Sequence, residues 1–459
     1  MADSILAPGR RLHTLEDSLT TLQSSTNLQS LIRRNRQGEK IGTYAVCSAH
    51  PTVLDAAIQQ ALEDGSILHV ESTSSQVNQL GGYTGQVPQQ FADFIHSAAR
   101  QAGLSAQQVL LGGDHLGPFP WRNELSQVAM EKACALVRAC VLAGYTKIHL
   151  DASMACADDN GPGLDEELIA TRAALLCDAA ERAYAELPTG SPQLVYVIGS
   201  EVPAPGGESE PGEPPAVTPI ENVNRTLEAF RTAFAKRGLS AAWEKVIGLV
   251  VQPGVEFGEE IIFNYDRSKA HSLSSALPKH PYLVYEAHST DYQPASALGQ
   301  MVEDHFAILK VGPWLTFAYR EAVFALSAIE QELLARKKEV RCSRVREALD
   351  ATMLANPNYW KSYYHGDEDT VHLARAYSYS DRCRYYWHES SVQKEIQFLV
   401  NNLSALQVPL PLISQYLPFG YAAIRDGQIQ SQPIQMIMHH IRRVLCVYAQ
   451  ACGVRRPKN

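Results

Sequence analysis

The sequence lacks long apolar runs and any excess of positive charge. Among its 459 residues we find no run of about 18 apolar residues, the length that a membrane-spanning helix needs. The first residues also contain no apolar stretch of signal-peptide length, so we expect a cytoplasmic protein that does not enter a membrane. Acidic residues outnumber basic ones by 49 to 40, and this net charge of −9 argues against nucleic-acid binding, which needs a positive field.

Cysteine frameworks and nucleotide-binding motifs are also missing. The nine cysteines include no CxxC pair, which favours reduced thiols. GGYTG at residues 81–85 is too weak a match to GxGxxG to indicate a dinucleotide-binding fold, and there is no HExxH zinc motif. What remains is a composition of 45% hydrophobic and 19% charged residues, which is typical of a globular protein.

Short apolar runs rich in β-branched residues predict eight β-strands. They occupy residues 41–47, 67–71, 109–114, 146–151, 193–201, 246–252, 282–288 and 306–311. Helical patterns lie between them, at residues 52–63, 88–102, 124–143, 165–186, 218–237, 268–277 and 295–304. This alternation predicts an α/β fold, a (β/α)8 TIM barrel, closed by a helix over residues 317–337.

The predicted barrel covers residues 41–337, and the remaining residues flank it. Residues 1–40 are predicted to form an N-terminal helical extension, because leucines recur there in an amphipathic pattern. The alternation stops near residue 338, and residues 338–459 are predicted to form a mainly helical C-terminal appendage rich in Tyr, Arg and Pro. Residues 203–219 are rich in Pro, Gly and acids and predict a long loop over one end of the barrel.

Residues 112–118, GGDHLGP, place an acid and a histidine where an apolar run ends. We expect the two glycines to turn the chain sharply, so that Asp114 and His115 stand at the end of a strand. In a TIM barrel the active site lies at the carboxyl ends of the strands. Seven of the eight predicted strands end in ionisable groups, although any one such residue is more often structural than catalytic.

This ring of acids predicts a metal ion. Crowded carboxylates repel one another unless they are protonated or neutralised, and a divalent cation is the simplest neutraliser. His115 and His288 are the best candidate ligands, with Glu256 or Glu201 completing the set. A mixture of imidazole and carboxylate suits Zn, Mn, Ni or Co with an open coordination position.

Several segments resemble one known family, from about residue 40 to the C-terminus. They include LGGDHLGP, KIHLDASMACADD, YVIGSEVPAPGG, VVQPGVEFG, YEAHSTDYQ and LKVGPWLTFA. These segments resemble the Z-type accessory-subunit family of the class II tagatose-bisphosphate aldolases, which is similar in fold to the zinc-dependent class II aldolases.

The resemblance implies roles for individual residues. Asp114 would handle a proton, His115 and His288 would bind the metal, and Glu201 would be a further catalytic residue. At the sixth strand the aldolases supply another histidine, where this chain has Gln252 and Glu256. We therefore expect Gln252 and Glu256 near the metal, and the change of ligand type argues against ordinary aldolase activity.

The resemblance implies two functions. One is a non-catalytic subunit that supports a class II aldolase, and the other is an epimerase that interconverts tagatose 6-phosphate and fructose 6-phosphate at C4. We favour the epimerase, and a true aldolase that releases trioses is a third possibility. The C4 hydrogen of a 2-ketose is not acidic, so inversion needs either a nicotinamide site, which the sequence does not show, or cleavage and re-formation of the C3–C4 bond.

Cleavage needs a metal, a base for the C4 hydroxyl and a lid. Asp114 is the leading base, and the candidates for a second acid–base group are Asp151, Asp291 and Tyr292. Residues 203–219 and GGYTG are predicted to form the lid. Substrate contacts are expected from Ser48, His50, Glu71, Ser289, Thr290, Lys310, Gly312 and Arg382 or its neighbour Arg384. We also expect a homo-oligomer, with the appendage as a subunit contact.

Overall fold

The computed structural model describes residues 24–159, 163–202, 213–277, 282–337 and 339–454. Its centre is a closed barrel of eight parallel strands in the order β1-β10-β9-β6-β5-β4-β3-β2. The strands are β1 (Thr43–Val46), β2 (Leu68–Thr73), β3 (Val109–Leu116), β4 (Lys147–Leu150), β5 (Val195–Ile198), β6 (Val246–Val250), β9 (Val284–Ala287) and β10 (Ile308–Val311). This arrangement confirms the predicted (β/α)8 barrel.

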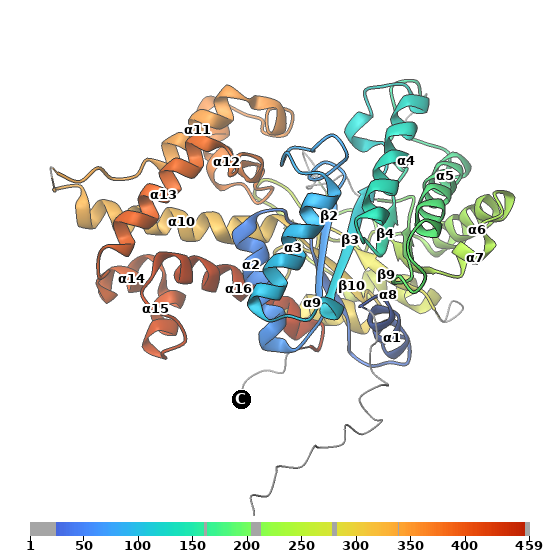
Figure 1. Cartoon of the computed structure of the whole chain (residues 1–459), viewed down its shortest axis with the longest axis horizontal. Helices are drawn as coiled ribbons and strands as arrows, with labels where there is room; N and C mark the ends of the chain where they lie inside the picture. The colour runs from blue at the N-terminus through green and yellow to red at the C-terminus, as the bar shows by residue number, and fades with distance from the viewer. Residues whose placement is uncertain (1–23, 160–162, 203–212, 278–281, 338, 455–459) are drawn as a thin grey trace, which may run out of the picture.

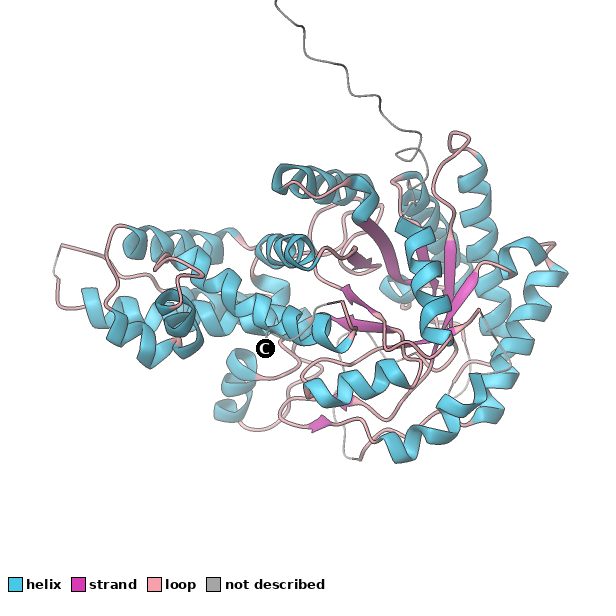
Figure 2. Cartoon of the chain, turned by 90° about the horizontal axis from the view of Figure 1, so that it is seen from below, coloured by secondary structure: helices cyan, strands magenta, loops and turns pink. Residues whose placement is uncertain are grey.

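Helices surround the barrel as the spacing of apolar residues predicts (Figure 2). They are α2 (Pro51–Asp64), α3 (Pro88–Ala102), α4 (Ser126–Leu142), α5 (Glu166–Ala185), α6 (Ile220–Lys236), the short α7 (Ser240–Trp243), α8 (Arg267–Ala276) and α9 (Ala295–Glu303). A small antiparallel hairpin of β7 (Glu256–Phe257) and β8 (Ile262–Phe263) follows β6. None of the described helices is long and apolar enough to cross a membrane.

Helix α1 (Ser24–Arg36) closes the amino end of the barrel. Its Leu28 and Ile32 are buried against residues near the starts of five strands, Leu110, Val195, Ile247, Val284 and Ile308. Residues 1–23 of the predicted N-terminal extension lie outside the described residues. Because α1 fills the amino end, the carboxyl end is left for a site.

A helical region follows β10 and extends to one side of the barrel (Figure 1). It contains α10 (Pro313–Leu334), α11 (Val345–Ala355), α12 (Glu368–Tyr377), α13 (Ser390–Ser404), α14 (Leu410–Tyr416), α15 (Pro418–Arg425), α16 (Pro433–Ala451) and the 3₁₀ turns η5 (Pro357–Tyr359) and η6 (Arg382–Tyr386). The mainly helical C-terminal appendage is therefore confirmed.

The last helix of the chain returns to the barrel, which differs from the expectation that residues 317–337 would close it. Helix α16 packs against α2, α9, α10 and strand β1, in the place of the eighth barrel helix. Its buried Ile437, Ile441, Leu445 and Tyr448 recur at helical spacing and form the apolar face that fits there. Helix α10 packs on the outside of α16 and leads into the helical region.

Candidate active site

A cavity of about 680 Å³ opens at the carboxyl end of the barrel. Its floor contains Asp114, His115, His288 and Lys310, which end or follow strands β3, β9 and β10. The helical region adds a second wall, which includes Tyr359, Arg382, Arg384 and Tyr385. A volume of this size is ordinary for a site that takes a small molecule.

Strand β3 contains Asp114 and His115, and the two glycines before them do not turn the chain as expected. The strand continues through Gly112 and Gly113 to Leu116, with an irregular register between Gly113 and Leu116. A Cβ on Gly112 would press on the side chain of Glu71, so this glycine makes room for a carboxylate inside the barrel. The change of direction falls on His115, whose φ of 49° is left-handed.

Two buried lysines neutralise carboxylates inside the barrel. The Lys147 ammonium lies 2.6 Å from Glu71 Oε1 and 2.7 Å from Glu286 Oε2. The Lys310 ammonium contacts Glu71 and lies 3.0 Å from Asp114 Oδ1 and 3.3 Å from Glu286 Oε1. Burial raises the pKa of Glu71 and of Glu286, but the two ammonium groups outweigh it and lower both pKa values below their usual range.

Three histidines stand together above these lysines. The ring centroids of His115 and His288 are 4.9 Å apart, and each lies 5.3 Å from that of His149. A carboxylate orients each ring: His115 Nδ1 lies 2.8 Å from Asp151, His149 Nδ1 lies 2.9 Å from Asp114, and His288 Nε2 lies 3.1 Å from Glu286. Carboxylates that hold imidazoles in this way are common around metal sites.

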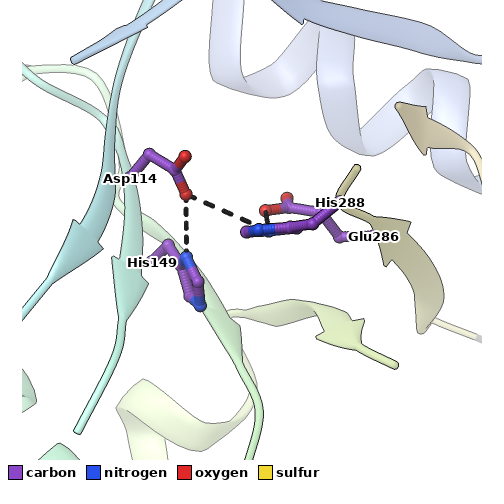
Figure 3. Close-up of side chains that lie close together, drawn as sticks. All are labelled: Asp114, His149, Glu286 and His288. Atoms are coloured by element: carbon purple, nitrogen blue, oxygen red, sulfur yellow. Dashed lines mark hydrogen bonds and ion pairs between the residues drawn. The ribbon is translucent and has the colours of Figure 1, made fainter. Parts of the chain in front are cut away.

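The residues present fit a divalent cation. Asp114, His149, Glu286 and His288 each offer a ligand atom, and these atoms lie within 4.8 Å of one another (Figure 3). Among the described residues, the buried Nε2 of His149 has no hydrogen-bond partner. Burial lowers the pKa of His288 to about 4, so its ring is neutral near pH 7, as a ligand must be.

The charges lead to the same conclusion. The carboxylates of Glu71, Asp114, Asp151 and Glu286 carry four negative charges. The ammonium groups of Lys147 and Lys310 carry two positive charges. These six side chains leave a buried charge of −2, before any proton on His115, whose pKa is raised by Asp114 and Asp151 against the effect of burial. One divalent cation balances this charge.

Several residues singled out in the sequence meet in this cavity. Besides those on its floor, Ser289, Asp291, Gly312 and Arg382 line it. Asp291 Oδ1 accepts the N–H groups of Gly312 at 3.0 Å and Trp314 at 2.8 Å. Burial outweighs these bonds and raises the pKa of Asp291 to about 6. A carboxyl group tuned in this way exchanges protons near neutral pH.

Other candidates lie among the described residues but outside the cavity lining. The Gln252 side chain accepts the N–H groups of Gly254 and Val255, and Glu256 lies in β7 and accepts the N–H of Phe257. Glu201 accepts hydrogen bonds from Thr218 and Asn222. The remaining six are Ser48, His50, Glu71, Asp151, Thr290 and Tyr292. Their assigned roles stay predictions.

His149, Glu286 and Lys147 are not among the site residues predicted from the sequence, although the sequence contains a signal for them. Charged or imidazole side chains recur two residues apart in otherwise apolar strands, as His69 and Glu71, Lys147 and His149, and Glu286 and His288. Side chains two apart in a strand share one face, and a polar pair in a buried strand therefore points into the barrel.

Fold and site together define a (β/α)8 barrel protein with a buried carboxylate–histidine centre at the carboxyl end of its strands. A family model described as "D-tagatose-1,6-bisphosphate aldolase subunit GatZ/KbaZ-like" matches residues 28–453. The chain belongs to this family.

Solved structures resemble the chain to very different degrees. A probable tagatose 6-phosphate kinase from Sinorhizobium meliloti 1021 is 40% identical, with a TM-score of 0.81, over 90% of this chain and 100% of that one. A fructose-bisphosphate aldolase from Campylobacter jejuni is 13% identical over 83% of this chain and 93% of that one, with a TM-score of 0.44. A putative fructose-1,6-bisphosphate aldolase from Coccidioides immitis is 13% identical over 83% and 98%, with a TM-score of 0.41.

Proposed function

We propose that the protein is a metal-dependent epimerase that inverts C4 of a ketohexose 6-phosphate and so interconverts tagatose 6-phosphate and fructose 6-phosphate. The observation that carries this proposal is the convergence of Asp114, His115 and His288 at the floor of one cavity, with His149 and Glu286 directly beside them. The family description and the name of the 40% identical relative share a tagatose phosphate but differ in the reaction.

Inversion at C4 proceeds by breaking and remaking the C3–C4 bond. A base removes the proton from the C4 hydroxyl, the electrons of the C3–C4 bond pass to an enediolate on the C1–C3 fragment, and C4 becomes an aldehyde. The aldehyde then turns, the enediolate attacks its other face, and the proton returns to the oxygen on C4. No atom is gained or lost, and no external oxidant is needed.

Different side chains of the cavity transfer the proton on the two faces of the aldehyde. Asp114 is ionised, because His115, Lys310 and His288 overcome the effect of burial and keep its pKa well below the usual range, and it takes the proton on one face. Asp291, with a pKa of about 6, serves the other face. Asp151 is committed to His115, and the Tyr292 hydroxyl to the carbonyl of Tyr379, so both act as supports.

A divalent cation held by the histidines and carboxylates of the floor would stabilise the negative charge that develops on the ketone oxygen. His115 and His288 are the two ligand residues predicted from the sequence, and His149 and Glu286 complete the set, which leaves Asp114 free to act as the base. The Asp151 carboxylate fixes the ring of His115 for this purpose. Lys147 and Lys310 keep the neighbouring carboxylates ionised.

The alternative function is a subunit that supports a class II tagatose-bisphosphate aldolase without catalysis of its own. The word "subunit" in the family description favours it. The same barrel would then act as a scaffold, and its buried charges would serve stability alone.

One experiment separates these functions. Purified protein is incubated with Mn or Zn and fructose 6-phosphate, and tagatose 6-phosphate and trioses are followed by NMR. We expect the epimer without free trioses. Accumulated trioses would indicate an aldolase, whereas absence of turnover, together with activation of an added class II aldolase, would indicate the subunit.

Metal binding is measured on the same preparations. We expect His115→Ala and His288→Ala to abolish metal retention and turnover while the apo protein unfolds at nearly the same temperature. The exposed His271 lies on α8, outside the site, and His271→Ala is the matched control that retains the metal. Full metal binding by both site variants would rule out the ligand assignment.

A further inference from the structure

The helical region supplies a wall of the cavity that is rich in arginine and tyrosine. The wall consists of Tyr359 from η5, Tyr363, and Arg382, Arg384 and Tyr385 from η6. It stands apart from the carboxylate–histidine floor in both sequence and chemistry. The floor carries the acids, whereas this wall carries two guanidinium groups.

Neutral groups hold the guanidinium of Arg384. It donates to the main-chain oxygens of Ser380 and Asp381, the latter at 3.1 Å, and to the hydroxyl of Tyr385 at 2.9 Å. None of the carboxylates in the described part of the chain forms an ion pair with Arg384. The nearby Asp381 carboxylate is engaged elsewhere, 2.6 Å from Thr316 Oγ1 and 3.4 Å from Arg320 Nε. Hydrogen bonding therefore fixes the cation without cancelling its charge.

A second guanidinium reinforces this charge. Arg382 Nη1 donates to the carbonyl of Tyr359 at 3.1 Å, and the group lies over the ring of Tyr363. Burial would raise the pKa of the Tyr385 phenol, but Arg384 and Arg382 outweigh burial and lower it. The Tyr385 phenol thus lies beside both guanidinium groups.

The GGYTG loop packs against the same wall. The Tyr83 ring lies edge-on to Tyr385, with centroids 4.8 Å apart, and 6.0 Å from the ring of Tyr359. Gly82 has a φ of 56°, and a Cβ there would overlap the carbonyl of Gln76, so the turn that presents Tyr83 needs glycine. Barrel and helical region together therefore enclose the two arginines.

We propose that Arg382, Arg384 and Tyr385, enclosed by Tyr83, form a binding site for a phosphomonoester dianion, and that this site makes the protein select phosphorylated ketoses over free ones. Fixed guanidinium groups present paired N–H donors to phosphate oxygens, and the dianion supplies a counter-charge to Arg384. The identity of the sugar rests on the proposed function, whereas the binding of phosphate does not.

Calorimetric titration of the full chain with inorganic phosphate tests the site directly. We expect saturable binding that Arg384→Met weakens at least about tenfold and Arg384→Lys weakens less, because lysine keeps the charge but not the paired donors. The control is Arg425→Met, since Arg425 is an exposed arginine of the same region that also donates to a tyrosine hydroxyl, at 3.0 Å. Thermal unfolding of each variant shows that a loss of binding is not a loss of fold.

The outcomes distinguish this site from the proposed function. Phosphate binding that is lost in Arg384→Met, without any epimerase turnover, supports the site and overturns the function. Turnover with phosphate binding unaffected by Arg384→Met overturns the site and leaves the function standing. In a competition arm, fructose 6-phosphate should displace phosphate far better than the carboxylate sugar fructuronate. Equal or tighter binding of fructuronate would overturn the assignment to a phosphomonoester.

Discussion

Lys147 illustrates how single residues hold the centre of this barrel. Its side chain is fully buried between Glu71 and Glu286 and forms ion pairs of 2.6 and 2.7 Å with them. Buried carboxylates that lose a compensating charge are far more costly than exposed ones. Lys310 also contacts Glu71 and Glu286, but it pairs with Asp114 as well, so without Lys147 one ammonium group would remain for three carboxylates.

We predict that Lys147→Met lowers the free energy of unfolding by roughly 3–5 kcal/mol, because two buried carboxylates are left poorly compensated. The control is Lys40→Met, since Lys40 also pairs with a glutamate, Glu303 at 2.7 Å, but on the surface. This control should lose only about 0–1 kcal/mol. Urea unfolding followed by circular dichroism measures both, and equal losses would show that the buried charges do not need this lysine.

Residue types at strand ends allowed part of the site to be predicted. Asp114, His115 and His288 stand out because each lies in a polar segment directly after an apolar run. His149 and Glu286 lie within their strands, and their signal in the sequence is a second polar residue two positions away, Lys147 and His288 respectively. Only barrel closure shows that they face the same space.

At the scale of elements, strand β3 and its junction with β4 position the Asp-His pair. Gly117 directly follows β3, and a Cβ at this position would overlap the carbonyl oxygen of Asp151. The main chains approach so closely that the Asp151 N–H bonds the carbonyl of Leu116 at 3.1 Å. This contact places Asp151 beside His115.

We predict that Gly117→Ala destabilises the protein by about 1–3 kcal/mol or more, because main chain rather than a movable side chain must shift. Metal affinity should fall as well, since His115 would lose its Asp151 support. Gly163→Ala is the control, because no atom of the described residues lies within 4 Å of a Cβ there, and it should change stability by less than about 0.5 kcal/mol. Thermal unfolding and metal titration report the two effects, and a stable Gly117→Ala variant with full metal affinity would contradict the argument.

The elements themselves followed from local patterns. Each of the eight predicted strands is present, and the helices between them differ from the predictions by only a few residues at their ends. The straight path of β3 through Gly112 and Gly113 could not be predicted from local patterns. A pair of glycines in a sequence usually indicates a turn, but here Gly112 provides space for the Glu71 side chain.

At the scale of the molecule, the last helix joins the C-terminal region to the barrel. Tyr448 of α16 donates to the carbonyl of Thr290 at 2.7 Å, and the main-chain oxygen of Cys452 accepts from Gly42 at 3.0 Å. The chain thus closes its barrel only after the helical region is complete. We infer that barrel and helical region unfold together.

We predict that Leu445→Ala, in the buried face of α16, costs about 2–5 kcal/mol and shifts one common transition for the whole chain. Leu373 on α12 is 57% exposed, and Leu373→Ala should cost less than about 0.5 kcal/mol. Near-ultraviolet circular dichroism and calorimetry follow both variants. Two separate transitions, with only one affected by Leu445→Ala, would show that the regions are independent.

The sequence by itself determined the class of fold and identified Asp114 and His115 as candidate site residues. Strand and helix periods are local properties, and an acid next to a histidine after an apolar run is a local pattern too. Only the tertiary structure decided which charges are buried together, that α16 closes the barrel, and that Arg384 and Tyr385 face the same cavity as His288. Those contacts join residues far apart in the chain, and their energies depend on burial, which no local pattern records.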